Sequence, residues 1–426
     1  MQQAFTTVLG KGVRSLAQLR GGGSALPGLF VEKIDPGYIR RTLMQLPRGI
    51  IVISGTNGKT TTTKMVVELL ESQGLCVFTN RTGSNFTRGV AAALLGEVDA
   101  GGKLHADIAV LELDEAYAVL FAQSIAPTYC LFLNVMRDQL DRFGEIDKTA
   151  ELLRTVALHT KGGVVINRDD PRLGNPSFTK AISVPVRTYG VHADLLTHFP
   201  SDDQLHEASS PTGMTGSKID DVNLDSIDGT HAVISYDGKH HAIDLALNGI
   251  YNVQNAVGAV ALTRMIMADN LDEPAMLAAL KSVTPAFGRG ESVTINGNAC
   301  ELVLVKNPAG FRLSLKSFDP DGYATMIAIN DNYADGRDMS WLWDVDFTSL
   351  KETGVSVVSG VRAYDMALRL QYDEVDFRQV DENLATGLAF LIDSYMDKPK
   401  RIYCTYTAML AIRRELGKRT KVEAVL

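Results

Sequence analysis

A short segment rich in glycine, lysine and threonine has the residue types and the spacing of a phosphate-binding loop. It follows an apolar run at residues 50–53, which predicts a buried parallel strand, and it precedes a helix that begins near Lys59. A strand, a glycine-containing turn and a helix N-terminus together point backbone N–H groups and a positive helix dipole at an anion. The residues expected to hold a nucleotide phosphate here are Gly55, Thr56, Asn57, Gly58, Lys59, Thr60 and Thr61.

Two side chains of this segment and one further carboxylate could serve phosphoryl transfer. Lys59 can reach the β- and γ-phosphates of a nucleotide, and the Thr60 hydroxyl can bind Mg²⁺. Residues 108–112 form a second apolar run that leads into acidic residues, and Glu112 falls at the carboxyl end of that expected strand. A carboxylate at this edge can hold the Mg²⁺ that bridges nucleotide phosphates. A solvated strand end is the alternative interpretation.

Other polar clusters are candidates for binding. Asn252 and Asn255 are three residues apart, so they share one face of an expected helix. Their amides could read the donor and acceptor edge of adenine, or they could simply cap the helix. The charged loops at residues 134–145 and 330–346 each follow an expected strand, which favours a functional loop over a solvated turn.

Composition limits the class of protein. A chain of 426 residues with 45% apolar and 22% charged residues is ordinary for an enzyme of two or three domains. The net charge of −8 argues against a nucleic-acid partner. No apolar run is long enough to span a membrane, and the N-terminus lacks the pattern of a signal peptide. The four cysteines stand far apart, which fits a reducing cytoplasm.

Residues 1–45 are a short preamble in which one helix is expected. Val8, Val13, Leu16 and Leu19 could line one face of it. We interpret it as a packing helix. A weak contact with anionic lipid head groups is the alternative.

The rest of the chain alternates strands and helices in two blocks. Residues 46–287 predict a doubly wound, mostly parallel sheet that carries the P-loop. Within this block, residues 192–239 are rich in Ser, Asp, Gly and His, which predicts an insertion of loops and short edge strands or a partly disordered excursion. Residues 288–426 repeat the α/β pattern and predict a Rossmann-like C-terminal domain.

Several of these segments together resemble the Mur ligase superfamily. Within it, the chain is similar to the ligase-like subunits of lipid II isoglutaminyl synthases. Its most specific motif is the stretch Asn-Asp-Asn-Tyr-Ala-Asp-Gly-Arg-Asp at residues 330–338, which contains the Ala-Asp-Gly-Arg-Asp core of residues 330–347. The other segments that carry the resemblance are residues 54–62, Glu112, residues 132–145, 167–170, Asn252 with Asn255, and residues 288–291 and 306–310.

The resemblance implies a reaction and its partners. The chain would use ATP and Mg²⁺ to activate the α-carboxylate of D-glutamate in the lipid II stem peptide as an acyl phosphate. A GatD-like class I glutamine amidotransferase would release the ammonia that displaces phosphate and gives D-isoglutamine, a step of peptidoglycan biosynthesis. Arg289 would face the γ-phosphate, and Asp338 would complete a Cys-His-Asp arrangement with the partner. The heterodimer would be cytoplasmic and act at the inner face of the cytoplasmic membrane.

The sequence departs from this pattern at three places. Many such subunits carry a four-cysteine zinc ribbon, but residues 192–239 contain no cysteine, so we expect no zinc and no zinc ligands. The preamble is too short for a domain that binds a uridine nucleotide, which suits a lipid-linked substrate. Gln139 stands where many Mur ligases have a histidine, so metal binding there is in doubt. An amino-acid-adding ligase, such as a folylpolyglutamate synthase, and a non-enzymatic ATP-binding scaffold are the alternatives.

Overall fold

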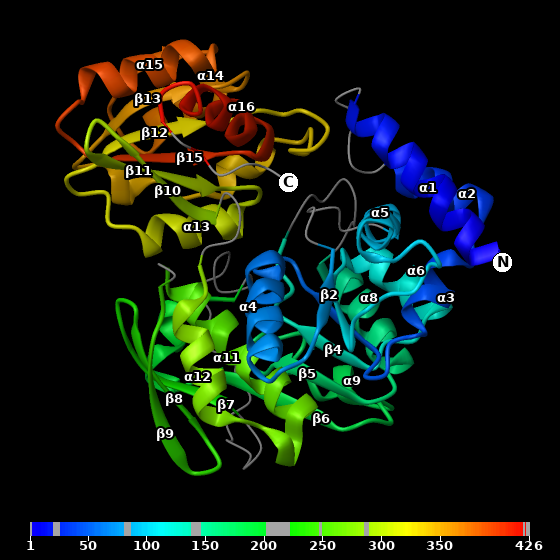
Figure 1. Cartoon of the computed structure of the whole chain (residues 1–426). Helices are drawn as coiled ribbons and strands as arrows, with labels where there is room; N and C mark the ends of the chain where they lie inside the picture. The colour runs from blue at the N-terminus through cyan, green and yellow to red at the C-terminus, as the bar shows by residue number, and fades with distance from the viewer. Residues whose placement is uncertain are drawn as a thin grey trace. The chain divides into compact units, whose positions relative to one another are not determined.

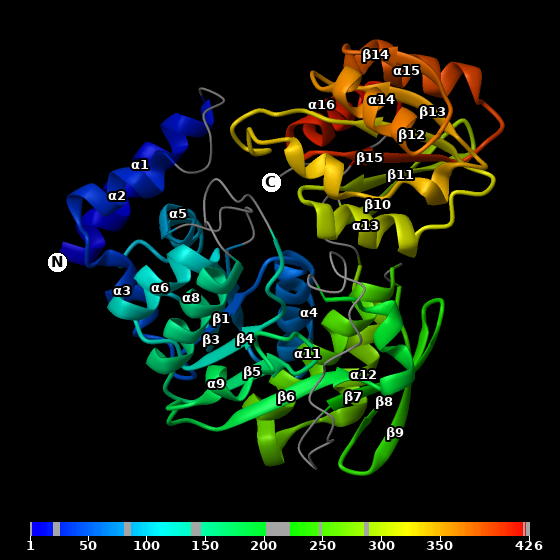
Figure 2. The same cartoon turned by 180° about the vertical axis from the view of Figure 1, so that it is seen from behind.

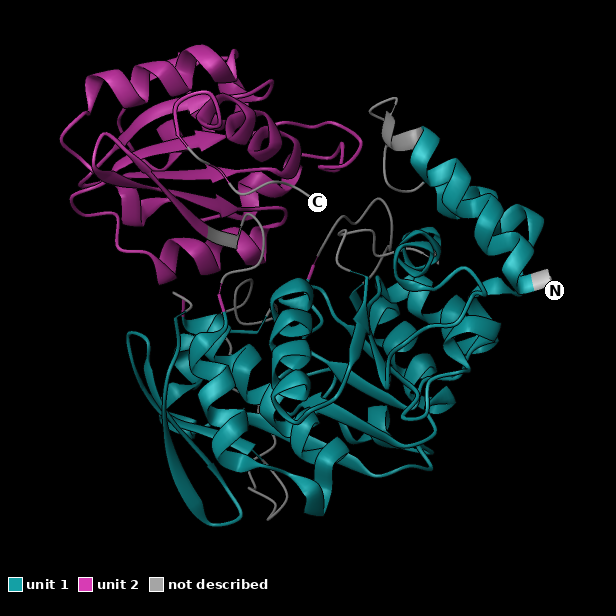
Figure 3. Cartoon of the chain, in the orientation of Figure 1, with its two compact units in different colours: residues 1–136, 145–246, 250–283 teal, residues 137–144, 247–249, 284–426 magenta. Residues whose placement is uncertain are grey.

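The protein folds into two compact units. The computed structural model describes residues 2–19, 26–80, 87–137, 146–201, 222–246, 249–284, 289–420 and 422. Unit 1 comprises residues 1–136, 145–246 and 250–283, and unit 2 comprises residues 137–144, 247–249 and 284–426 (Figure 3). The domain boundary expected between residues 287 and 288 falls within residues 285–288, outside the described residues.

Unit 1 is built on one sheet, which has nine strands in the described residues. Neighbouring strands are parallel from β2 to β7, and β8 and β9 continue the sheet as antiparallel strands. This arrangement confirms the predicted doubly wound, mostly parallel sheet. In spatial order the strands are β2 (Val77–Thr79), β3 (Ile108–Glu112), β1 (Ile50–Ser54), β4 (Tyr129–Phe132), β5 (Gly163–Asn167), β6 (Val186–Val191), β7 (Val222–Asp228), β8 (His231–Tyr236) and β9 (Lys239–Asp244).

Helices cover both faces of this sheet because its central strands are apolar along their whole length. All five residues of β1 are buried, and successive side chains point to opposite faces. Ile50 and Val52 belong to the buried cluster that includes residues of α5 (Thr87–Glu97), α6 (Glu115–Ser124) and α8 (Ile146–His159). On the other face, α4 (Lys59–Ser72) packs against α11 (Ile250–Met267) and α12 (Glu273–Ser282), as Figures 1 and 2 show.

Strand order changes direction at β1, and this determines where a ligand can bind. The connection that follows β1 leads to β2, on the side of β3, whereas the connection that follows β3 leads to β4, on the other side of β1. In doubly wound sheets the binding crevice lies at such a point. The remaining helical elements of unit 1 are α1 (Gln2–Leu19), α2 (Leu26–Ile34), α3 (Tyr38–Leu43), α9 (Pro176–Thr179), η1 (Ala193–His198) and η2 (Ala268–Asn270).

The preamble helix forms and packs, but two of the four side chains named for its packing face are exposed. Val8 and Leu16 are 60% and 62% exposed, so the packing interpretation is wrong for both of them. Helix α1 instead packs on α2 and α5 through other residues. No helix in the described part of the chain is long and apolar enough to cross a bilayer.

Unit 2 is the predicted second α/β unit, with two edge strands that the sequence pattern did not reveal. The described strands follow the order β10 (Arg289–Ile295), β11 (Asn298–Leu304), β15 (Lys400–Cys404), β12 (Ala324–Ala328), β13 (Val355–Ser359) and β14 (Phe377–Asp381). All neighbours are parallel except β10 and β11, which form an antiparallel hairpin. The helical elements are α13 (Pro308–Ser317), α14 (Ala363–Tyr372), α15 (Leu384–Ser394), α16 (Tyr406–Leu416), η3 (Ser340–Asp344) and η4 (Thr348–Leu350).

The two missed strands, β10 and β14, are polar because each lies at an edge of the sheet. A local signal for β10 was nevertheless present. Asn296 and Gly297 have φ angles of 52° and 78° and join β10 to β11, as the two central residues of a tight hairpin turn must. The 192–239 excursion supplies two strands, β7 and β8, but neither is the edge strand that we expected, because β9 continues the sheet beyond them; residues 202–221 lie outside the described residues.

Candidate functional site

The expected phosphate loop joins β1 to α4 at the carboxyl edge of the sheet. Gly55 has a φ angle of 131°, and a Cβ there would lie 2.9 Å from the carbonyl oxygen of Asn134. Gly58 has a φ angle of 89° and stands at the N-cap of α4, where a Cβ would lie 2.7 Å from Oδ1 of Asn255. Only glycine fits both positions, because each combines a left-handed backbone with a crowded surrounding.

Asn134, which follows β4, holds the loop in shape. Its Oδ1 accepts a hydrogen bond of 2.9 Å from the backbone N–H of Asn57, and its Nδ2 donates to the Asn57 carbonyl at 3.0 Å. The Thr56 hydroxyl accepts from the backbone N–H of Met136 at 3.0 Å. The loop is therefore fixed from the side by the segment that follows β4. Residues 138–145, which include Gln139, lie outside the described residues.

Lys59 places its charge beside the loop. Its side chain is 5% exposed, and Nζ donates a hydrogen bond of 2.5 Å to the carbonyl oxygen of Gly55. Nζ also lies 3.7 Å from Oε1 of Glu115 at the start of α6. An ammonium group at a helix N-terminus adds to the positive end of the helix dipole, so the loop is suited to an anion. The sequence had not indicated Glu115, although it belongs to the acidic run after β3.

Thr60 and Glu112 come together as the sequence predicted. The Thr60 hydroxyl donates a hydrogen bond of 2.9 Å to Oε1 of Glu112, and Glu112 is 4% exposed. Asn80 fixes the backbone of Glu112 from both sides, since its Nδ2 donates to the carbonyl at 2.9 Å and its Oδ1 accepts from the N–H at 3.0 Å. Asn80 was also missed, because only the paired strands β2 and β3 make it a neighbour of Glu112.

The oxygen atoms at this edge suit a hard divalent cation. Thr60 and Glu112 offer a hydroxyl and a carboxylate, the ligand types that Mg²⁺ prefers. Nearby in sequence, Oδ1 of Asp114 is buried and has no hydrogen-bond partner in the described part of the chain. The described residues contain no group of three or more His, Cys, Asp or Glu side chains that could hold a metal. A magnesium ion held here would therefore complete its shell with phosphate and water oxygens.

Asn255 and Asn252 lie on α11, which packs against α4. Asn255 is buried, and its amide lies against Gly58 of the loop. Asn252 is half-buried one turn nearer the start of α11. The structure thus brings Asn255 to the phosphate loop, and a contact with adenine stays a prediction for both residues.

Arg289 belongs to unit 2. Its backbone opens β10 opposite Val303, and its side chain lies outside what the structure describes. Its predicted position facing the γ-phosphate therefore stays a prediction.

The two aspartates of the Ala-Asp-Gly-Arg-Asp motif have different surroundings in unit 2. Asp335 is 3% exposed and accepts a hydrogen bond of 2.7 Å from the backbone N–H of Thr407, so it ties the loop to α16. Burial raises the pKa of Asp335. Asp338 is exposed, and its Oδ1 accepts from the backbone N–H of Ser340 at 2.9 Å. Hydrogen bonds from Ser340 hold the pKa of Asp338 below its ordinary value, which favours a permanent carboxylate.

The crowding at Gly58 leads to a first prediction. Gly58→Ala should destabilise the protein by about 3 kcal/mol, since left-handed backbone strain of roughly 1–2 kcal/mol adds to the collision with Asn255. Gly74→Ala is the matched control: Gly74 also has a positive φ angle, of 79°, but no described atom lies within 4 Å of a Cβ built there. Denaturant unfolding measures both variants. Replacing Asn255 with alanine should recover part of the Gly58→Ala loss, and equal losses for the two glycine variants would contradict the crowding.

Family models match both parts of the chain. The model described as the Mur ligase middle domain matches residues 53–263, which contain the phosphate loop, Glu112 and Asn255. The model described as MurT ligase C-terminal matches residues 304–409, which contain Asp335 and Asp338.

Solved structures share the fold. MurF from Acinetobacter baumannii matches with a TM-score of 0.67 and 18% identity over 90% of this chain and 78% of that chain. MurF ligase from Thermotoga maritima in complex with ADP matches with a TM-score of 0.65 and 17% identity over 90% of this chain and 83% of that chain.

Curated relatives match at higher identity. The MurT subunit of lipid II isoglutaminyl synthase (glutamine-hydrolyzing) of Streptococcus pneumoniae is 30% identical, over 94% of this chain and 93% of the relative. The same subunit of Staphylococcus aureus strain COL is 28% identical, over 83% of this chain and 84% of the relative. The likeness to the Streptococcus pneumoniae subunit thus covers nearly the full length of both chains and includes the phosphate loop. This chain belongs to the MurT family of Mur ligases.

Proposed function

We propose that this chain is the ligase subunit of a lipid II isoglutaminyl synthase. It amidates the α-carboxylate of D-glutamate in the stem peptide of lipid II, with ammonia from a glutaminase partner. The observation that carries the proposal is the 30% identity to a MurT subunit across nearly the whole chain. The arrangement of Lys59, Thr60 and Glu112 around a phosphate loop supports it.

The first half of the reaction makes the carboxylate reactive. A carboxylate oxygen of the substrate attacks the γ-phosphorus of ATP, the bond to the bridging oxygen breaks, and ADP leaves. Phosphoryl transfer requires positioning and charge neutralisation more than covalent help. The backbone N–H groups of the loop and the Lys59 ammonium supply positive charge to the phosphates. Thr60 and Glu112 would hold Mg²⁺, which adds further positive charge there when bound.

The second half replaces phosphate with an amide. Ammonia attacks the carbonyl carbon of the acyl phosphate, inorganic phosphate leaves, and the nitrogen loses a proton. A GatD-like class I glutamine amidotransferase would supply the ammonia by hydrolysing glutamine. Asp338 is suited to assist that partner, because it is an exposed carboxylate with a lowered pKa and can orient a histidine in the partner's site.

An exposed apolar surface in the same unit as Asp338 supports a partner of this kind. We define the docking face as Trp343 with Val361, Tyr364, Leu368 and Tyr372, all of which are exposed. Tyr364, Leu368 and Tyr372 recur every four residues along α14, so they share one face of that helix. The rings of Trp343 and Tyr372 meet edge to face with centroids 5.0 Å apart. Trp343 follows Asp338 by five residues, so partner binding there would bring the partner near this carboxylate.

The enzyme alternative, an amino-acid-adding ligase, has narrower support. UDP-N-acetylmuramate–L-alanine ligase of Burkholderia thailandensis is 31% identical, but over 65% of this chain and 53% of its own. The match of residues 304–409 to the MurT C-terminal model favours amidation over amino-acid addition.

Removing the Lys59 charge should stop catalysis without separating the subunits. Lys59→Ala should lower amidation by about 10²–10³-fold with either glutamine or ammonium chloride, because charge neutralisation at the phosphates is lost. Mass spectrometry of amidated lipid II measures this. The control is Lys64→Ala on the same helix, whose lysine pairs with Glu68 at 3.9 Å. Full amidation by Lys59→Ala, with the complex intact, would instead favour the scaffold interpretation.

Asp338 should matter for glutamine and not for ammonia. Asp338→Asn should lower glutamine-dependent amidation by roughly 10²-fold or more and leave ammonium-dependent amidation unchanged. Asp346→Asn is the matched control, since Asp346 is also exposed and accepts a backbone hydrogen bond of 2.9 Å from Thr348, two residues on. Unchanged glutamine-dependent activity in Asp338→Asn would show that our assignment of Asp338 is wrong.

The docking face should carry binding energy for the partner. Replacing both Tyr364 and Tyr372 with alanine should weaken partner binding by about 2 kcal/mol, or roughly 30-fold in Kd, because exposed aromatic residues are frequent hot spots. Titration with the purified glutaminase measures the effect. Tyr406→Ala, at an exposed tyrosine of α16, should bind normally. If the double variant also bound normally, the partner would use another surface.

A further inference from the structure

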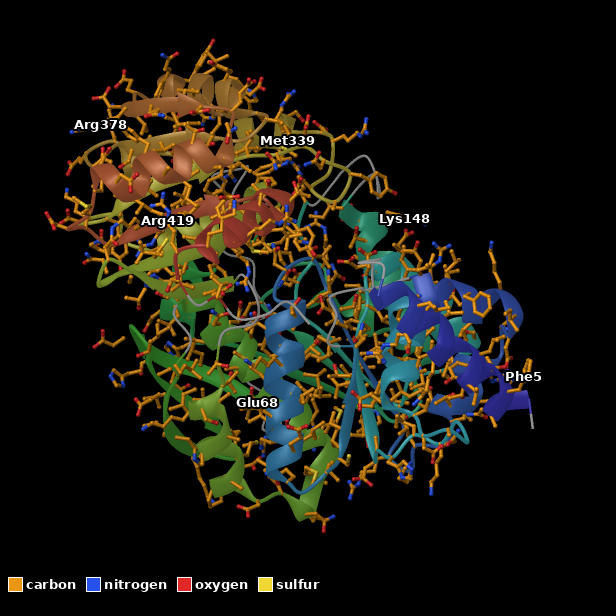
Figure 4. All side chains as sticks on the ribbon, turned by 45° about the horizontal axis from the view of Figure 1, so that its top comes forward. Phe5, Glu68, Lys148, Met339, Arg378 and Arg419 are labelled. Atoms are coloured by element: carbon orange, nitrogen blue, oxygen red, sulfur yellow. The ribbon has the colours of Figure 1, made fainter. Side chains whose placement is uncertain are left out.

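Helix α1 exposes four large apolar side chains and turns several polar ones inward. Phe5, Val8, Leu9 and Leu16 are 67%, 60%, 38% and 62% exposed, and we call them the outer stripe. Their spacing of three, four and seven residues puts them on one side of the helix. Figure 4 labels Phe5, whose side chain lies on the outer side of this helix.

The inner side of α1 is held by hydrogen bonds to unit 1. The Thr6 hydroxyl donates to Oδ2 of Asp35 at 2.9 Å, and Nζ of Lys11 donates to the carbonyl oxygen of Val98 at 2.6 Å. Nε2 of Gln3 donates to the carbonyl oxygen of Gly102 at 2.8 Å. These bonds fix the rotation of α1 about its own axis. The helix cannot turn its outer stripe inward without breaking them.

This orientation is the reverse of the one expected for a helix facing water. A surface helix normally buries its apolar stripe, since full burial of a large apolar side chain is worth about 1.5–3 kcal/mol. Here four such side chains remain outside while Thr6 and Thr7 are buried. Helix α2, which packs along α1, adds exposed apolar side chains at Leu26 and Ile34. The outer stripe therefore has the composition of a surface that meets an apolar phase.

The charges of α1 indicate which apolar phase it meets. Residues 1–20 contain Lys11, Arg14 and Arg20 but no acidic residue, while the whole chain has a net charge of −8. Lys11 and Arg14 are half-buried on the inner side of α1, where Nζ of Lys11 bonds to the Val98 carbonyl and the Arg14 guanidinium lies against Gly96 of α5. An anionic lipid surface therefore attracts this segment through its net positive charge and not through direct contacts of these two side chains. A helix with an apolar stripe and a net positive charge lies in the head-group boundary.

We propose that the outer stripe of α1 docks this chain on an anionic bilayer surface. The helix lies in the plane of the head groups with Phe5, Val8, Leu9 and Leu16 directed into the acyl boundary. This rests on the proposed function for its role, because lipid II presents its peptide close to the membrane and docking keeps unit 1 near that peptide.

Vesicle sedimentation with the full chain tests the docking. The chain should bind vesicles of phosphatidylcholine containing phosphatidylglycerol, and bind neutral phosphatidylcholine vesicles at least tenfold more weakly. A Phe5→Gln/Val8→Gln/Leu16→Gln variant should lose at least tenfold in affinity for the anionic vesicles. Leu120→Gln/Leu158→Gln is the matched control, since these leucines are 58% and 40% exposed on α6 and α8 of the same unit. Equal binding by the triple variant and the control would overturn the proposal.

Two parallel measurements separate docking from the proposed function and from other occupants. The vesicles contain no lipid II, and amidation is assayed on a detergent-dispersed lipid II analogue, where the triple variant should turn over normally. If the unchanged chain turns over normally but does not bind vesicles, the docking proposal is wrong and the proposed function stands. If the unchanged chain binds vesicles but does not amidate the analogue, the result counts against the proposed function. If the triple variant instead lost glutaminase binding or self-association, the stripe would be a protein interface and the proposal would be wrong.

Discussion

The close contact between Gly58 and Asn255 is the constraint on which the phosphate loop depends. The loop can turn from β1 into α4 only because residue 58 has a left-handed backbone and no side chain. Asn255 lies against it from α11, which packs along α4. This contact therefore links the loop after β1 to helix α11, which comes much later in the chain. The positions of Lys59 and Thr60 follow from it, because both begin the helix that this turn allows.

The acidic edge beside the loop has its own support. Glu112 ends β3, and Asn80 at the end of the neighbouring β2 fixes its backbone with reciprocal hydrogen bonds. Its carboxylate is therefore presented to Thr60 by the sheet and not by a loose loop. In unit 2, the two aspartates of the Ala-Asp-Gly-Arg-Asp motif differ in their surroundings. Asp335 is buried and ties the loop to α16, whereas Asp338 is exposed, as its proposed role toward a glutaminase partner requires.

The sequence alone was enough to predict the elements and site residues that depend on a local pattern. The apolar run before Gly55 predicted β1, and the acidic end of residues 108–112 predicted that Glu112 would meet Thr60. It was not enough to predict contacts between side chains that lie on elements far apart in the sequence. Glu115 approaches Lys59, and Asn80 approaches Glu112, only through the pairing of strands. The outward direction of Val8 and Leu16 was also not predictable, because it depends on polar partners such as Asp35 that accept bonds from the other side of α1.

The proposed function depends on one step, in which this chain activates a carboxylate by phosphorylating it. Transfer of ¹⁸O from the carboxylate to phosphate reports on this step. Lipid II labelled in the α-carboxylate of its D-glutamate is amidated with ATP and ammonium chloride by this chain, and the released phosphate is examined by mass spectrometry. We expect one ¹⁸O atom in inorganic phosphate for each amide formed, since the carboxylate oxygen leaves with the phosphoryl group. Amide formation with unlabelled phosphate would contradict it.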